Sequence, residues 1–228
     1  MWIDLFLFLL LGHLIADFAL QTTRSCQDKS TRKWHSPDLY VHTAVVTGVS
    51  WLVSWDLWFW WCSLVIGISH FAIDLWKTNR EDRAKWFVLD QLMHLLVLAI
   101  VSWIWTIHHE WTAPFGIKTY YITIAVAVIA CWKPANIFIK LILKHYSVSM
   151  PEDKTGFNAG ALIGTVERWL ILIFMCLQRY DALGLLIAAK SIIRFSDRET
   201  DKTEYVLAGT LLSILIAVIA GLGVFLMK

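Results

Sequence analysis

Long apolar runs dominate this sequence and limit what it can fold into. Each run is close to the roughly 20 residues that an α-helix needs to cross a bilayer, and polar stretches separate the runs. Inside hydrocarbon a helix satisfies all its backbone hydrogen bonds within one segment. Only 17% of the 228 residues are charged, against about 25% in a soluble domain. The runs therefore predict an all-α, polytopic integral membrane helix bundle.

The spacing of the runs predicts about eight transmembrane helices in a single transmembrane domain, residues 1–228. The first four cover about 2–21, 39–57, 58–77 and 86–107, and later ones cover about 157–178, 182–196 and 205–227. A fifth begins near 119, where Pro134 either kinks a long helix or starts a new one. The domain thus has a four-helix half at 1–107 and a second helical half at 119–228.

Basic residues gather in alternate connections between the predicted helices. The first and third connections contain Arg24, Lys29, Arg32, Lys33, Lys77, Arg80, Arg83 and Lys85. Because cytoplasmic loops of membrane proteins carry the excess of lysine and arginine, these connections are expected to face the cytoplasm. The first connection is either a site for anionic membrane lipid or simply a solvated basic loop.

Three of the apolar runs carry a histidine and an aspartate four residues apart. The pairs are His13 with Asp17, His70 with Asp74 and, in reverse chain order, Asp90 with His94. Residues i and i+4 share one helix face, and the reversed order fits a helix that runs in the opposite direction. His42 lies about one turn into the second run, at a similar depth. We expect these seven side chains in one layer near the cytoplasmic ends of the first four helices.

The chemistry of this layer points to a divalent metal. Ionisable residues at membrane depth cost roughly 2.5–3.5 kcal/mol each, so they face the bundle and pair. Three carboxylates repel one another unless protons or a cation offset the charge. Mixed nitrogen and oxygen ligands suit zinc, manganese or iron, of which zinc is favoured. The expected metal ligands are His13, Asp17, His70, Asp74 and His94, with Asp90 as ligand or catalytic general base and His42 as ligand or catalytic proton shuttle.

Other readings of the same pairs stay open. Each pair could be a buried hydrogen bond that ties helices together, and the layer as a whole could relay protons. Some of the seven side chains could orient the metal ligands by hydrogen bonds without contacting the metal, or the layer could hold two metal ions.

The second half has a charged group of its own. Glu167 and Arg168 lie inside the sixth predicted helix, while Lys190 and Arg194 share one face of the seventh. Arginine and lysine in a desolvated pocket bind phosphate or carboxylate. These four residues are therefore candidates for binding an anionic or phosphate-bearing substrate. Alternatively, Glu167 forms a structural pair with Lys190 or Arg168.

Five strings of the sequence carry a family resemblance. They are HLIADFALQ (13–21), HFAIDLWK (70–77), LDQLMHL (89–95), GTVERWLIL (164–172) and LIAAKSIIRF (186–195). The strings resemble an uncharacterised family of bacterial multi-pass membrane proteins, a domain of unknown function, over most of the chain. The resemblance implies the bacterial cytoplasmic membrane as the location and supplies no activity. The HxxxD pattern on two helices is also similar to the intramembrane zinc site of cation-diffusion-facilitator transporters, although those transporters lack the DxxxH helix. Histidine and aspartate on successive helices are similar, too, to small bacterial membrane proteins described as metal-dependent hydrolases.

We favour a metal-dependent membrane enzyme, a hydrolase or transferase that acts on a phosphate-bearing or lipid-linked substrate at the cytoplasmic leaflet. The metal would acidify a bound water, and Arg168, Lys190 and Arg194 would hold the anionic group. One alternative is a metal-ion or proton-coupled transporter, and another is a structural or interaction protein. The apolar outer halves of the first four helices favour the enzyme. No basic stripe with interleaved aromatics predicts nucleic-acid binding, and the oligomeric state stays open.

Overall fold

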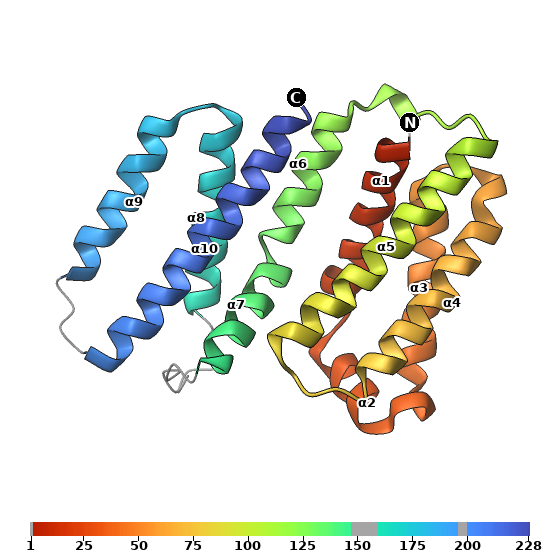
Figure 1. The fold of residues 1–228 in the computed structure, drawn as a ribbon, viewed down its shortest axis with the longest axis horizontal. Helices are drawn as coiled ribbons and strands as arrows, with labels where there is room; N and C mark the ends of the chain where they lie inside the picture. Colours follow the sequence, from red (N-terminus) through yellow and green to blue (C-terminus); the bar gives the residue numbers. More distant parts are fainter. Residues whose placement is uncertain (1, 147–158, 196–199) are drawn as a thin grey trace. The chain divides into compact units, whose positions relative to one another are not determined.

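The computed structural model describes residues 2–146, 159–195 and 200–228, and within these ranges every regular element is helical (Figure 1). The predicted all-α class is therefore confirmed. The chain divides into two compact units, residues 1–126 and 127–228. This boundary lies inside the helix predicted to begin near 119, while a single domain over the whole chain stays a prediction.

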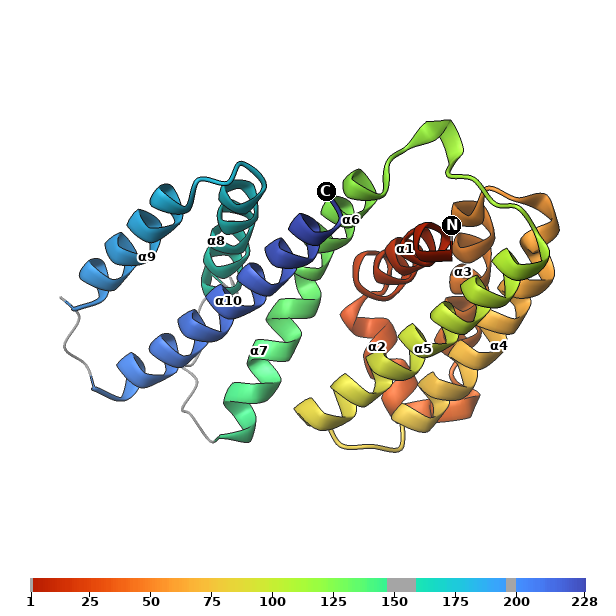
Figure 2. The same ribbon diagram turned by 45° about the horizontal axis from the view of Figure 1, so that its top comes forward.

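Four helices form the bundle of the first unit. They are α1 (Trp2–Leu14), α3 (Pro37–Ser54), α4 (Trp60–Lys77) and α5 (Ala84–His108). Helix α1 packs against α3 and α5, and α4 packs against the same two helices, so the four close into a ring (Figures 1 and 2). At the end near the N-terminus, the ring is filled by an apolar core that includes Leu5, Leu9, Phe59, Leu98 and Trp105. Every helix of the ring thus has one face that points into the bundle.

The basic first connection contains a helix that its sequence pattern does not predict. Helix α2 (Thr23–Arg32) lies at the end of the bundle opposite the N-terminus (Figure 1). Thr22 caps α2 by accepting a hydrogen bond from the backbone N–H of Ser25. Lys29 is the one buried residue of α2. A helix this polar has no apolar stripe to reveal it, so its pattern is that of a solvated loop.

Among the described residues, four helical segments are long and apolar enough to cross a membrane. They are Trp2–Leu20, Leu57–Lys77, Ala84–His108 and Leu207–Leu226, the last of these within α10 (Thr200–Leu226). Helices α6 (Thr119–Ala130) and α7 (Lys133–His145) add a fifth if the pair, bent by 43°, is one span. Pro134 lies in the first turn of α7, so it starts a new helix. The count of about eight spans stays a prediction.

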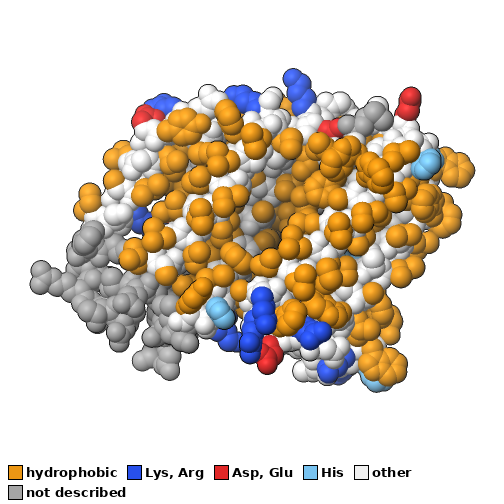
Figure 3. Space-filling model, in the orientation of Figure 1, with side chains coloured by type: hydrophobic (Ala, Val, Ile, Leu, Met, Phe, Trp, Pro, Cys, Tyr) orange, Lys and Arg blue, Asp and Glu red, His pale blue; other side chains and the backbone are white. Residues whose placement is uncertain are grey.

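The surface agrees with a membrane environment for these helices. On the face shown in Figure 3, apolar side chains cover the middle of the helices, and charged side chains gather toward the helix ends. Trp51, Trp58, Trp60 and Trp103 are among the exposed aromatic side chains. Such residues are enriched where a membrane protein meets the headgroups.

The second unit contains α7, α8 (Ala159–Cys176), α9 (Tyr180–Phe195) and α10. Helix α10 packs against both α7 and α8, and α9 packs against α8. Helix α9 has 16 residues, fewer than the roughly 20 that cross a bilayer.

The close approach of α3 and α4 depends on Gly67. A Cβ atom at position 67 would lie 2.0 Å from Thr47 Oγ1, and that hydroxyl donates a hydrogen bond to Thr43 O. We expect Gly67→Ala to lower the free energy of unfolding by about 1–3 kcal/mol, because overpacking forces the helices apart. Gly48→Ala on α3 is the matched control, since its Cβ meets nothing within 4 Å. Thermal unfolding in detergent measures both variants, and equal stability would contradict the prediction.

Candidate metal centre

The structure brings together all seven histidines and aspartates expected in one layer. Their ligand atoms form three overlapping groups, in each of which the atoms lie within 4.8 Å of one another. The groups are His13, His70 and His94; Asp17, His42 and His70; and Asp74, Asp90 and His94. We call these seven residues the His/Asp cluster. Six of them are buried, and the side chain of Asp17 is only 10% exposed.

Each helix of the ring contributes to the His/Asp cluster. The predicted i, i+4 spacing places His70 Nε2 3.8 Å from Asp74 Oδ1 on α4, and His94 Nε2 3.5 Å from Asp90 Oδ1 on α5. His42 comes from α3. The distances confirm that each of these two pairs lies on one helix face. The ring geometry then turns the four faces toward a common interior.

Asp17 reaches the cluster from a π-helical turn. The α-helical hydrogen bonding of α1 ends at Leu14, and η1 (Ile15–Leu20) continues the same span as a π-helix. His13 Nε2 lies 3.8 Å from Asp17 Oδ2 across this transition. Single π-helical turns are rare in proteins overall, and those that occur are often found at functional sites. The turn thus carries Asp17, while His13 lies just before it in α1.

Three ligand atoms form a compact triangle. Asp17 Oδ1 lies 3.2 Å from His42 Nε2 and 3.5 Å from His70 Nε2, and the two imidazole nitrogens are 3.1 Å apart. A tetrahedral zinc with bonds of about 2.0–2.1 Å separates its ligands by roughly 3.3–3.4 Å. The triangle therefore has the size of one face of a metal site. Two histidines and one carboxylate leave the further coordination positions open.

Several ligand-type atoms of the cluster are buried without a hydrogen-bond partner. They are His13 Nε2, Asp17 Oδ1, Asp90 Oδ1 and His94 Nε2. A buried polar atom that lacks a partner costs about 1–3 kcal/mol. Four such atoms in one cluster indicate a common partner, and a divalent cation accepts electron pairs from imidazoles and carboxylates together. The residues present fit a metal ion.

Two lysines bind the carboxylates of the third group. Lys29 Nζ lies 2.5 Å from Asp74 Oδ2, and Lys77 Nζ lies 2.5 Å from Asp90 Oδ2. In the sequence both lysines belong to the basic connections. The i, i+3 spacing of Asp74 and Lys77 places Lys77 near the cluster, but it does not identify Asp90 on α5 as its partner. Nothing in the sequence pointed to Lys29, whose position depends on the unpredicted helix α2.

The lysines leave Asp17 as the one carboxylate of the cluster without an ammonium partner in the described part of the chain. Three carboxylates and two ammonium groups give the cluster a formal charge of −1 while its four imidazoles are neutral. A buried net charge is unfavourable unless it is compensated. With neutral imidazoles, the carboxylate that lacks an ammonium partner within the described ranges is Asp17, which lies at the triangle.

The charged residues of the second half are mostly engaged within their own unit. Arg168 is 1% exposed and donates to four oxygen atoms, those of Cys131 O, Asn136 Oδ1, Thr165 Oγ1 and Ser213 Oγ. Lys190 pairs with Glu167, as the structural alternative expected. The side chain of Arg194 lies outside the described residues. A substrate-binding role for these four residues stays a prediction.

The first half of the chain identifies its protein family. A model of a family described as a protein of unknown function, DUF3307, matches residues 5–122. The chain belongs to the DUF3307 family. The DUF3307 match nearly coincides with the first compact unit and contains the whole His/Asp cluster. The later strings GTVERWLIL and LIAAKSIIRF lie beyond the DUF3307 match. No curated protein and no solved structure matches the chain.

Asp74 has a lysine partner, and Asp17 has none among the described residues. Asp→Asn substitutions at these two positions of the DUF3307 region are therefore predicted to change stability in opposite directions. In metal-free protein, Asp17→Asn should raise the free energy of unfolding by about 1–2 kcal/mol, because it removes an uncompensated buried charge. Asp74→Asn should lower it by about 3–5 kcal/mol, because it leaves the buried ammonium of Lys29 unpaired. Chelator-treated protein in detergent, unfolded thermally, measures both. A loss of stability in both variants would show that Asp17 already has a compensating partner.

Proposed function

We propose that the His/Asp cluster binds one divalent metal ion, with zinc favoured and manganese or iron as alternatives. The protein would then be a metal-dependent hydrolase or transferase that acts on a phosphate-bearing or lipid-linked substrate at the cytoplasmic leaflet. The observation that carries this proposal is the triangle of Asp17, His42 and His70, with edges of 3.1–3.5 Å. A metal at such a site polarises a phosphoryl oxygen and lowers the pKa of bound water.

The residues around the triangle have complementary roles in this proposal. Asp74 Oδ1 lies 3.8 Å from both His70 Nε2 and His94 Nε2, so this carboxylate can orient the imidazoles or add a ligand. Asp90 and His94 are placed to accept and release a proton, because His94 Nε2 lies 3.5 Å from Asp90 Oδ1. Lys29 and Lys77 already pair with Asp74 and Asp90, so the positive charge that attracts an anionic substrate would come from the metal itself.

The charge of the cluster favours one metal ion over two. One divalent ion changes the formal charge from −1 to +1, which a single anionic oxygen of a substrate would neutralise. Two ions would raise it to +3, a charge that is far more costly inside a bundle of apolar helices. A single proton bound in place of the metal would change the formal charge from −1 to zero. The charge of the cluster is therefore also compatible with the proton-relay alternative.

The packing of the bundle argues against a transporter. A transported ion must reach its site from both sides of the membrane. Toward the N-terminal end, the ring is closed by Leu5, Leu9, Leu98 and Trp105, each of which is 0–2% exposed. Among the described residues, every group of three that could bind a metal belongs to the His/Asp cluster. Access is therefore expected from the α2 end only, which suits an enzyme.

Metal content tests the proposal directly. Detergent-purified protein loaded with zinc should contain about one equivalent by elemental mass spectrometry. The double variant Asp17→Asn/His42→Gln should contain less than about a tenth of this, because it loses two of the three triangle ligands. His35→Gln is the matched control, since His35 is exposed and outside the cluster. No bound metal in the wild type would leave the proton relay or helix packing as the function of the cluster.

The same preparation distinguishes an enzyme from a transporter. In sealed vesicles, the metal-loaded protein should release or transfer phosphate from a phosphate-bearing lipid without moving metal across the bilayer. Metal flux that is lost in Asp17→Asn/His42→Gln, with no turnover, would support the transporter.

The lysines are predicted to limit the metal content. Asp74, Asp90 and His94 have their ligand atoms within 4.8 Å, but Lys29 and Lys77 neutralise the two carboxylates. We expect the double variant Lys29→Met/Lys77→Met to bind about two equivalents of zinc instead of one, because the freed carboxylates attract a second cation. Elemental analysis after metal loading measures the difference. An unchanged single equivalent would mean that the third group does not bind metal even without the lysines.

A further inference from the structure

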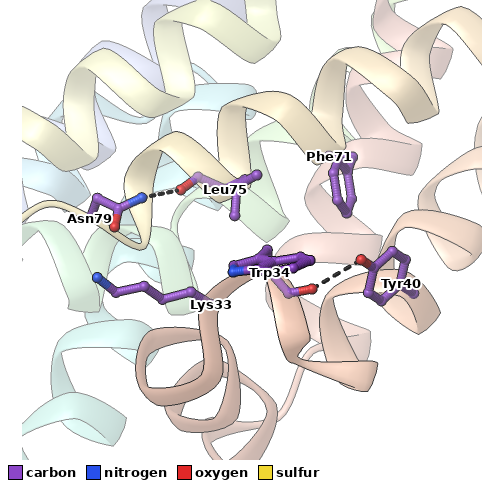
Figure 4. Close-up of a pocket in the computed structure, with 6 residues that line it drawn as sticks. All are labelled: Lys33, Trp34, Tyr40, Phe71, Leu75 and Asn79. Atoms are coloured by element: carbon purple, nitrogen blue, oxygen red, sulfur yellow. Dashed lines mark hydrogen bonds between the residues drawn. The ribbon is translucent and has the colours of Figure 1, made fainter.

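A pocket of about 460 Å³ lies on the flank of the first unit, at the same end of the bundle as α2. Its walls come from the turn after α2, the start of α3 and the end of α4, and no member of the His/Asp cluster lines it (Figure 4). The lining residues are Lys33, Trp34, Tyr40, Phe71, Leu75 and Asn79.

The pocket has two chemically different ends. Figure 4 shows Lys33 and Asn79 at one end and the rings of Phe71 and Tyr40 at the other, with Trp34 between them. The aromatic end is held by a Tyr40–Phe71 ring contact at 5.4 Å and by the Tyr40 hydroxyl, which donates to Trp34 O at 2.9 Å. At the polar end, the Asn79 side-chain amide donates to Leu75 O. A ligand that fits must therefore be polar at one end and apolar at the other.

Lys33 supplies an available cation at the polar end. Within the described part of the chain it makes no ion pair, whereas the neighbouring Arg32 pairs with Asp28. Its backbone has φ 53° and ψ −125°, a conformation that favours glycine and is strained for lysine. Backbone geometry therefore does not explain a lysine at this position. Strained positions of this kind cluster at functional sites.

We propose that this pocket binds one anionic phospholipid of the cytoplasmic leaflet. The pocket flanks the last turns of the span Leu57–Lys77, at the end that the basic connections are expected to place at the cytoplasmic headgroups. The lipid phosphate would lie at Lys33, the glycerol region beside Trp34 and Tyr40, and an acyl chain along Phe71 and Leu75. Lysine near an anionic leaflet and aromatic rings at headgroup depth are the expected partners of such a lipid.

The lipid would lie against the turns of α4 that carry two members of the His/Asp cluster. Phe71 and Leu75 directly follow His70 and Asp74 in the sequence. The pocket and the cluster thus share one helix and one depth. The binding of the lipid does not rest on the proposed metal function, and each can fail without the other.

Native mass spectrometry of the full-length protein in a delipidating detergent tests the proposal. We expect one phosphatidylglycerol to bind at least about fivefold more tightly than phosphatidylcholine with the same acyl chains, the ratio that one lysine near the membrane supplies. Glycerol phosphate, which has the charge without the chains, should not bind measurably. Equal affinity for the two lipids, or binding of glycerol phosphate as tight as that of the lipid, would overturn the proposal.

Variants at position 33 separate binding from folding. Lys33→Gly should lose the preference for phosphatidylglycerol while its unfolding temperature is equal to or above that of the wild type, because glycine adopts the φ of 53° without strain. Lys33→Arg should retain the preference, as should the control Arg32→Gln. If Lys33→Gly is unstable, Lys33→Gln serves as the second charge-removing variant. A preference that persists without the charge at position 33 would overturn the proposal.

Discussion

Burial of three carboxylates among apolar helices is the constraint on which the rest of the first unit depends. A carboxylate at that depth needs a compensating charge, and a helix bundle offers few polar groups. Two of the three carboxylates, those of Asp74 and Asp90, form ion pairs at 2.5 Å with the ammonium groups of Lys29 and Lys77. The third, Asp17, faces two imidazole nitrogens instead. Within the ring of α1, α3, α4 and α5, Asp17 is therefore the carboxylate whose charge only imidazoles contact in the described part of the chain.

This arrangement gives α2 a function that its composition conceals. Its surface is polar, and its one buried side chain reaches the carboxylate of Asp74. The helix thus covers the charged end of the bundle by an ion pair, without an apolar interface. Breaking a buried pair of this kind leaves one charge uncompensated and is therefore costly. Because the apolar core fills the opposite end of the bundle, access for a substrate is expected at the α2 end.

The sequence predicted the helices well because their signal is local. The apolar runs predicted α3, α4, α5 and the break at Pro134 to within a few residues. The i, i+4 spacing of His70 with Asp74 and of Asp90 with His94 predicted the shared faces, since helix geometry alone decides it. Lys29 could not be assigned, because its partner lies 45 residues away and α2 has no apolar stripe. The four hydrogen bonds of Arg168 could not be predicted either, because they depend on the packing of other helices.

The π-helical turn at Ile15–Leu20 continues the span that α1 begins, but with a different hydrogen-bonding pattern. Leu5 and Leu9 before the turn belong to the apolar core, and so does Ala16 within it. Asp17, the next residue, lies beside His42 and His70 of the neighbouring helices. Because a π-helix closes its hydrogen bonds over five residues instead of four, the angular spacing of side chains changes within these six residues. An insertion or deletion in the turn would therefore disturb the ligand geometry while Leu5 and Leu9 kept their packing.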